Sequence, residues 1–222
     1  GAPWRTRIFG AVRSLNRLGA IAPAAANLAG ASALGRALSR RMLGFHPKRS
    51  VPRFARSLGR SFPPATRGDG ARVVLFGDCF TMFNEPGIGL ATRRVFEACG
   101  YRVELADAGC CGRAKISMGL LPEAIAEADA TLARLRGVIE DEGVAAVLVA
   151  EPSCLSAFKD DWLQLRLRTS IELRKALAAK SFLPEEFLDT HWERHPRRPS
   201  FAAPAGGRVV LHGHCHQKAL WG

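Results

Sequence analysis

Cysteines are the residues of this chain best suited to chemistry. The sequence contains six of them, at positions 79, 99, 110, 111, 154 and 215. Soft thiolate ligands bind iron–sulfur clusters, zinc or copper(I). The adjacent pair Cys110 and Cys111 suits a multinuclear cluster, because neighbouring side chains diverge and can reach different metal atoms. Structural zinc favours short C-x2–4-C spacings, and none occurs here.

The residues around the cysteines also favour a site. In GCCGR (109–113), Gly109 and Gly112 flank the cysteine pair and let the backbone approach a bulky group closely. EPSC (151–154) and HGHCHQK (212–218) are rich in residue types that bind metals. Nothing in the sequence suggests secretion, so we expect a cytoplasmic protein, either free or peripheral to the inner face of the membrane. In a reducing compartment, clustered cysteines are metal ligands or redox groups rather than disulfides.

The pattern of apolar residues predicts strands that alternate with helices. Short apolar runs predict buried strands at 72–77, 102–106, 145–150 and 208–213. Apolar residues at helical spacing predict helices at 86–99, 122–142, 154–180 (in one or two pieces) and 183–193. This alternation predicts an α/β fold in which βαβ units form a parallel sheet between two layers of helices.

Five of the cysteines lie just after the carboxyl end of a predicted strand. Cys79 follows the first strand, Cys110 and Cys111 the second, Cys154 the third and Cys215 the fourth. Ligands of open α/β sheets bind at this edge, so we expect these five side chains to converge on one rim. Cys99 instead continues the apolar stripe of its helix, and we expect it in the hydrophobic core.

The positive charge of the chain is confined to its N-terminal third. Residues 1–70 contain 13 Lys and Arg and one acidic residue, Asp69, whereas residues 71–222 contain 19 of each charge. Apolar spacing predicts helices at 4–18 and 24–43, before repeated prolines and glycines break 44–70. Such segments bind nucleic acid or anionic lipid in some proteins. Aromatic interleaving and a nucleic-acid motif are missing, so we expect no nucleic-acid partner. We predict a basic helical, Pro-rich linker (1–70), whose removal leaves the metal content unchanged, and a cysteine-rich domain (71–222).

The cysteine motifs resemble those of a known family. GDCF (77–80), GCCGR, EPSC and HGHCHQKAL (212–220) are together similar to the CCG cysteine-rich domain. That domain occurs in heterodisulfide reductase B subunits and in iron–sulfur subunits of enzymes that oxidise D-lactate, glycolate and glycerol 3-phosphate. EPSC and HGHCHQKAL most resemble the C-terminal part of single-chain FAD-binding oxidoreductases acting on D-2-hydroxy acids. The resemblance covers residues 72–221, and residues 1–70 are similar to the connector that follows a ferredoxin-like 4Fe–4S domain.

The resemblance implies roles for the cysteines, because two CCG motifs bind iron–sulfur clusters in the family. Carried over, the ligands of the first unit are Cys79, Cys110, Cys111 and Cys154. Cys215 then opens a second unit, which we expect in a continuation of the chain beyond Gly222. Heterodisulfide reductases have C-x-x-C where this chain has EPSC, so Glu151 stands at one ligand position. This departure favours a simpler, 4Fe–4S-type cluster.

The polar residues near the cysteines have more than one interpretation. Glu151 is either a ligand or the N-terminal residue of a helix, and Asp78 suits a turn. His212, His214 and His216 alternate at a strand end and cannot all face one site. We expect His214 or His216 to orient Cys215 or to hydrogen-bond a cluster sulfur rather than to bind metal. Three cations near the cysteines either offset the charge of a cluster or are simply solvated: Arg113, Lys115 and Lys218.

Together these features predict an electron-transfer domain with a 4Fe–4S-type cluster. In the parent oxidoreductase that the resemblance implies, a flavin domain oxidises a 2-hydroxy acid, and electrons pass through the clusters to an acceptor such as a quinone or a cytochrome. No G-x-G-x-x-G follows a predicted strand, so FAD belongs to that partner, and we expect no catalysis by this chain alone. Two rival functions are thiol–disulfide chemistry at the cluster, as in heterodisulfide reductases, and a zinc-stabilised binding module with a basic arm.

Overall fold

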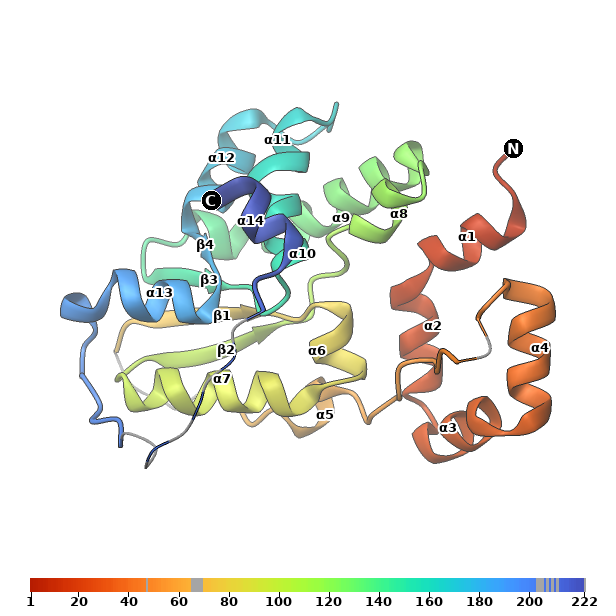
Figure 1. Ribbon diagram of the computed structural model, residues 1–222. Helices are drawn as coiled ribbons and strands as arrows, with labels where there is room; N and C mark the ends of the chain where they lie inside the picture. The colour runs from red at the N-terminus through yellow and green to blue at the C-terminus, as the bar shows by residue number, and fades with distance from the viewer. Residues whose placement is uncertain are drawn as a thin grey trace.

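A parallel sheet lies at the centre of the molecule (Figure 1). The computed structural model describes residues 1–46, 48–64, 70–202, 206, 208, 210 and 212–221. Within them, the strands are β1 (Arg72–Phe76), β2 (Arg102–Ala106), β3 (Val144–Leu148) and β4 (Ser181–Phe182). They are ordered β2-β1-β3-β4, and every neighbouring pair is parallel. The predicted α/β class is therefore confirmed.

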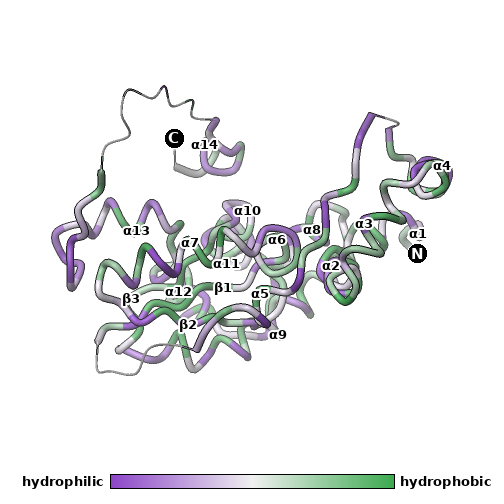
Figure 2. Tube along the Cα trace, turned by 90° about the horizontal axis from the view of Figure 1, so that it is seen from below, coloured by the Kyte–Doolittle hydropathy of each residue, from purple (hydrophilic) through white to green (hydrophobic). Residues whose placement is uncertain are grey.

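Helices cover both faces of the sheet. The connections contain α6 (Cys79–Phe83), α7 (Pro86–Ala98), α8 (Arg113–Ser117), α9 (Leu121–Glu140), α10 (Pro152–Ser156), the π-helical η1 (Ala157–Asp161), α11 (Trp162–Gln164) and α12 (Ile171–Lys180). After β4 come α13 (Pro184–Thr190), the 3-10 helix η2 (Trp192–Arg194) and α14 (Cys215–Trp221). One core cluster joins the sheet to α9 and α12, and a second joins its other face to α6, α7 and α13. Figure 2 shows hydrophobic residues along the strands between these two layers.

The strand order creates a crevice at one edge of the sheet. From β1 the chain passes over one face, through α6 and α7, to reach β2. From β3 it passes over the opposite face, through α10 and α12, to reach β4. Because β1 and β3 are neighbours, their connections diverge. Such a switch point leaves a crevice outside the carboxyl ends of the strands, where ligands of α/β proteins bind.

The first three strands and the two long helices between them, α7 and α9, agree with the sequence-based prediction to within about two residues, as expected for element boundaries. The short helices α6 and α8 were not predicted. The fourth strand does not agree with the prediction. The position beside β3 is occupied by the short strand Ser181–Phe182, which the sequence did not suggest. The predicted strand 208–213 lies partly outside the described residues, and its described members, Arg208, Val210, His212 and Gly213, are not in a strand. Cys215 consequently begins a helix instead of following a strand.

The basic N-terminal segment folds into short helices that pack on the α/β part. The predicted helix 4–18 is two helices, α1 (Trp4–Gly10) and α2 (Val12–Gly19). The predicted helix 24–43 is likewise divided, into α3 (Pro23–Ala31) and α4 (Ala33–Leu43), because Ser32 caps the second one. A fifth helix, α5 (Leu58–Ser61), follows. Helix α1 contacts α8, while α2 and α5 contact α6. In the described part of the chain, no helix is both long enough and apolar enough to cross a membrane.

Two leucines of α9 test how much of the stability depends on this packing. Leu132 is fully buried against the sheet, whereas Leu121 on the same helix is 44% exposed. We expect Leu132→Ala to lower the free energy of unfolding by about 2–5 kcal/mol, because it leaves a cavity in the core. Leu121→Ala should change it by no more than about 0.5 kcal/mol. Urea unfolding of both variants measures the difference, and equal losses would contradict the assigned packing of α9.

Candidate metal centre

Four cysteine sulfurs meet at the switch point of the sheet. Cys79 begins α6 directly after β1, Cys110 and Cys111 lie in the loop after β2, and Cys154 lies in α10 after β3. The sulfurs of Cys79 and Cys110 are 3.5 Å apart, and those of Cys111 and Cys154 are 2.8 Å apart. All four are buried, free cysteines. The predicted convergence is therefore observed for these four residues.

Helix caps fix the two cysteines that follow β1 and β3. The Oδ1 atom of Asp78 accepts hydrogen bonds from the backbone N–H groups of Phe80 and Thr81, both at 2.9 Å, and so starts the helix that carries Cys79. Glu151 plays the same part before Cys154, because its carboxylate accepts from the backbone N–H and the hydroxyl of Ser153. Of the two interpretations of Glu151, the structure shows helix capping. Asp78 is an N-cap as well as a turn residue.

The loop that carries the cysteine pair is held by its carbonyl groups. The carbonyl of Cys110 accepts a hydrogen bond from the Thr131 hydroxyl at 2.9 Å, and that of Cys111 accepts one from the Trp162 indole at 3.1 Å. Gly109 has a φ of 124°, and an added Cβ would lie 2.6 Å from the Thr131 hydroxyl. The close approach of α9 to this loop therefore requires glycine. Neither Thr131 nor Trp162 stood out in the sequence, since both lie within apolar helical stretches.

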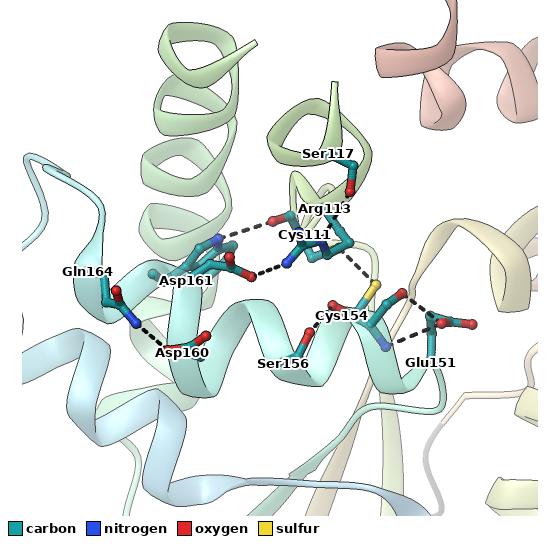
Figure 3. Close-up of polar contacts among 11 residues, drawn as sticks. Cys111, Arg113, Ser117, Glu151, Cys154, Ser156, Asp160, Asp161 and Gln164 are labelled. Carbon is teal, nitrogen blue, oxygen red and sulfur yellow. Dashed lines mark hydrogen bonds and ion pairs between the residues drawn. The ribbon is translucent and has the colours of Figure 1, made fainter. Parts of the chain in front are cut away.

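Arg113 stabilises the same region from its outer side. Its guanidinium forms an ion pair with Asp161 at 2.5 Å, while Cys111 contacts Cys154 nearby (Figure 3). Asp161 belongs to the π-helical turn between α10 and α11, a distortion that is frequent at functional sites. Arg113 is thus partly exposed and paired with a carboxylate, and this ion pair ties the loop after β2 to the helices after β3.

The four cysteine thiols of this group differ in pKa. Hydrogen bonds from Cys111 and Cys79 lower the pKa of Cys110 to about 2, against the effect of its burial. The hydrogen bond to Cys110, and then burial, raises the pKa of Cys79, and Cys111 likewise has a raised pKa through Cys110 and Cys154. The hydrogen bond from Cys111 lowers the pKa of Cys154, but burial and negative neighbours outweigh it and leave this pKa raised. These directions favour the thiolate form at Cys110 over the other three cysteines.

Comparison with known proteins identifies the segment that carries this group. Residues 73–159 match the family model of the cysteine-rich domain CCG. This segment is therefore similar to a CCG domain, the name used for it from here on. The match includes all four clustered cysteines and ends before Cys215. No curated protein and no solved structure shows a significant match to the chain. A CCG domain with four clustered cysteines indicates an iron–sulfur or metal-binding module.

The remaining predicted site residues lie apart from the cysteine group of the CCG domain. Cys215 is exposed at the start of α14, although this helix contacts α10. The rings of His214 and His216 stack on each other, with centroids 5.4 Å apart. Lys218 is exposed on the same helix. Roles for these residues at a metal centre stay predictions. Cys99 is fully buried in the core on the other face of the sheet, as predicted.

Arg13 of the basic segment reaches the cysteine group, and no pattern in the sequence indicated this contact. Arg13 of α2 donates a hydrogen bond to the carbonyl of Gly77 at 2.9 Å, and its guanidinium lies 4.0 Å from the sulfur of Cys79. It also forms an ion pair with Asp107 in the loop after β2. Burial lowers the pKa of Arg13, but the negative groups around it outweigh burial and raise it. The contact argues against our prediction that residues 1–70 are a linker without influence on metal binding.

The donor set fits a thiolate-bound metal centre in which Cys111 and Cys154 would lie farther apart than they do here. Two thiolates on one tetrahedral metal, with bonds of about 2.3 Å, lie about 3.8 Å apart. The Cys79–Cys110 distance of 3.5 Å is close to this value, whereas the Cys111–Cys154 distance of 2.8 Å is too short. Within the described ranges, no group of three or more His, Cys, Asp or Glu side chains is arranged to hold a single metal ion. All four donors are soft sulfur atoms, which favour iron–sulfur clusters, zinc or copper(I) over hard cations.

The thiolate on Cys110 can be tested in reduced protein stripped of metal. Cys110→Ser should abolish the ultraviolet absorbance of a thiolate at neutral pH, and the matched core variant Cys99→Ser should retain it. Because the pKa of Cys110 is lowered from 9.0 to about 2 on folding, the thiolate stabilises the fold fully above about pH 9 and progressively less as the pH falls towards 2. Urea unfolding of Cys110→Ser should therefore depend less on pH than that of the wild type. Unchanged absorbance in this variant would place the thiolate elsewhere.

Proposed function

We propose that the CCG domain binds a 4Fe–4S-type cluster and transfers electrons within an FAD-linked oxidoreductase that oxidises a 2-hydroxy acid. The observation that carries this proposal is the buried group of four contacting cysteine sulfurs, supplied by the ends of three parallel strands. Cys79, Cys110, Cys111 and Cys154 would be the ligands. The resemblance of EPSC and HGHCHQKAL to FAD-binding oxidoreductases supports the 2-hydroxy-acid substrate class.

The environment of the cysteines suits electron transfer. A bound cluster supplies a site that accepts and releases electrons, and the protein sets its potential through burial, charge and hydrogen bonds. Here the sulfurs are buried, and the loop between Gly109 and Gly112 is fixed by hydrogen bonds to its carbonyl groups. Gly112 also donates its backbone N–H to the Cys110 sulfur, at 3.4 Å. A rigid site of this kind changes its geometry little when the charge of the cluster changes, which favours rapid electron transfer.

The proposed function requires partners that supply and remove electrons. A flavin-containing dehydrogenase domain would donate the electrons. A quinone or a cytochrome in or at the inner face of the membrane would accept them, and a ferredoxin-like 4Fe–4S domain would lie between the donor and the acceptor. The basic segment supports docking to an acidic neighbouring domain. Several of its large apolar side chains are more than half exposed, among them Leu18, Ile21, Leu28 and Leu34, and a partner surface would cover them.

Burial disfavours the rival thiol–disulfide function. Substrate sulfur would need to reach one cysteine of the group, yet Cys79, Cys111 and Cys154 are each no more than 7% exposed, and Cys110 is 9% exposed. The rival zinc-stabilised module would use the same cysteines, so the identity of the bound metal, iron or zinc, distinguishes it from the proposed function.

The decisive experiment is metal analysis of the chain purified without oxygen. We expect iron and acid-labile sulfide in similar amounts, a brown colour and a paramagnetic signal after reduction. Zinc without sulfide would show the binding module instead. Protein free of metal that exchanges thiols with disulfide substrates would show the heterodisulfide-type function.

Serine substitutions test which cysteines hold the cluster. Cys79→Ser and Cys154→Ser should each lower the iron content several-fold, because each removes one soft ligand. Cys99→Ala, a change to a buried cysteine on the other face, should keep the iron content of the wild type. Iron per chain, measured after anaerobic reconstitution, gives the comparison. Equal iron loss in Cys99→Ala would mean that the losses reflect general destabilisation.

A further inference from the structure

Arg13 is the cation of the basic segment that is built into the metal centre. Its side chain is only 15% exposed. Its guanidinium donates to the Gly77 carbonyl, approaches the Cys79 sulfur to 4.0 Å, pairs with Asp107 and lies over the ring of Phe83, 5.5 Å from the centroid. These contacts come from the loop after β1, from α6 and from the loop after β2, so three segments hold the guanidinium in place.

The helix that carries Arg13 is itself anchored to the CCG domain. The amide of Asn16 donates to the side chain of Asn84 at 2.8 Å, one turn after Arg13. Ala20, at the end of α2, is buried in the core cluster that contains Met82 and Phe83 of α6. Helix α2 therefore has polar and apolar contacts to the helix that begins with Cys79, and Arg13 does not depend on its own hydrogen bonds alone for its place.

We propose that Arg13 is a permanent counter-charge of the cysteine-bound cluster, which strengthens metal binding and raises the reduction potential. This inference rests on the proposed function. A cluster with four thiolate ligands carries net negative charge, and a buried cation close to one of the sulfurs stabilises that charge. Reduction adds one electron to the cluster and makes its charge more negative. The cation therefore stabilises the reduced state more than the oxidised state.

Arginine suits this role better than the other cations of the segment. It stays charged at any physiological pH, and its planar guanidinium can meet a carbonyl, a carboxylate and an aromatic ring at once. Arg17 lies on the same helix, one turn later, and is exposed. It offers a matched control, because its removal takes the same charge from the same helix at a position open to solvent, where screening weakens its effect.

The test compares Arg13→Gln, Arg13→Lys and Arg17→Gln with the wild-type chain after anaerobic loading. The two readouts are the midpoint potential of the bound cluster and the rate at which a chelator removes iron. Arg13→Gln should lower the potential and release iron about 10-fold faster, a typical effect of losing a group that supports metal ligands. Arg13→Lys, which keeps the charge, should recover most of both properties, and Arg17→Gln should match the wild type.

A second variant keeps the test decisive should Arg13→Gln fail to fold. In Asp107→Asn, the Gly77 carbonyl and Phe83 still hold Arg13, whose charge is no longer neutralised by the carboxylate. The potential should therefore rise. A potential that is unchanged or lower in Asp107→Asn, or a loaded Arg13→Gln indistinguishable from Arg17→Gln, would overturn the role of Arg13. A wild-type chain that binds no iron would instead overturn the proposed function itself.

Discussion

The structure depends on the parallel pairing of β1 with both β2 and β3. Neighbouring strands in a sheet lie about 4.8 Å apart, so the residues that follow them are near neighbours in space whatever their distance in sequence. Cys79, Cys110 and Cys154 are separated by dozens of residues, yet each follows one of these three strands. Because the connections after β1 and β3 leave on opposite faces of the sheet, the cysteines gather in the crevice between them.

Burying four thiols at such an edge requires that the surrounding loops be rigid. Irregular backbone has polar groups that need partners when water is excluded. Side chains of the covering helices meet this need, with Thr131 and Trp162 bound to the carbonyls of the cysteine pair. Asp78 and Glu151 do the same for the backbone N–H groups at the starts of α6 and α10. The cluster of sulfurs is thus held by contacts from both layers, and the basic segment adds a charge from a third direction.

The failed and the successful sequence predictions have different physical origins. The first three strands were predictable because buried parallel strands are continuous apolar runs bounded by turn residues. The run at 208–213 has a similar composition, but its described members, 208, 210, 212 and 213, are not in a strand, and Ser181–Phe182 pairs with β3. Composition shows that a segment can be buried in a sheet, whereas the neighbour it pairs with depends on the connections before it. Cys215 begins α14 instead of following a strand, so its place at the rim stays a prediction.

By itself, the sequence determined the α/β class, the convergence of Cys79, Cys110, Cys111 and Cys154, and the core position of Cys99. Each follows from local patterns, namely strand runs, helical spacing and the rule that the carboxyl ends of parallel strands share one edge. Only the tertiary structure decided that Glu151 caps a helix, that Arg113 pairs with Asp161 and that Arg13 approaches Cys79. These are contacts between segments far apart in the chain or choices between equivalent local roles. No periodicity encodes them, because they depend on how whole helices pack.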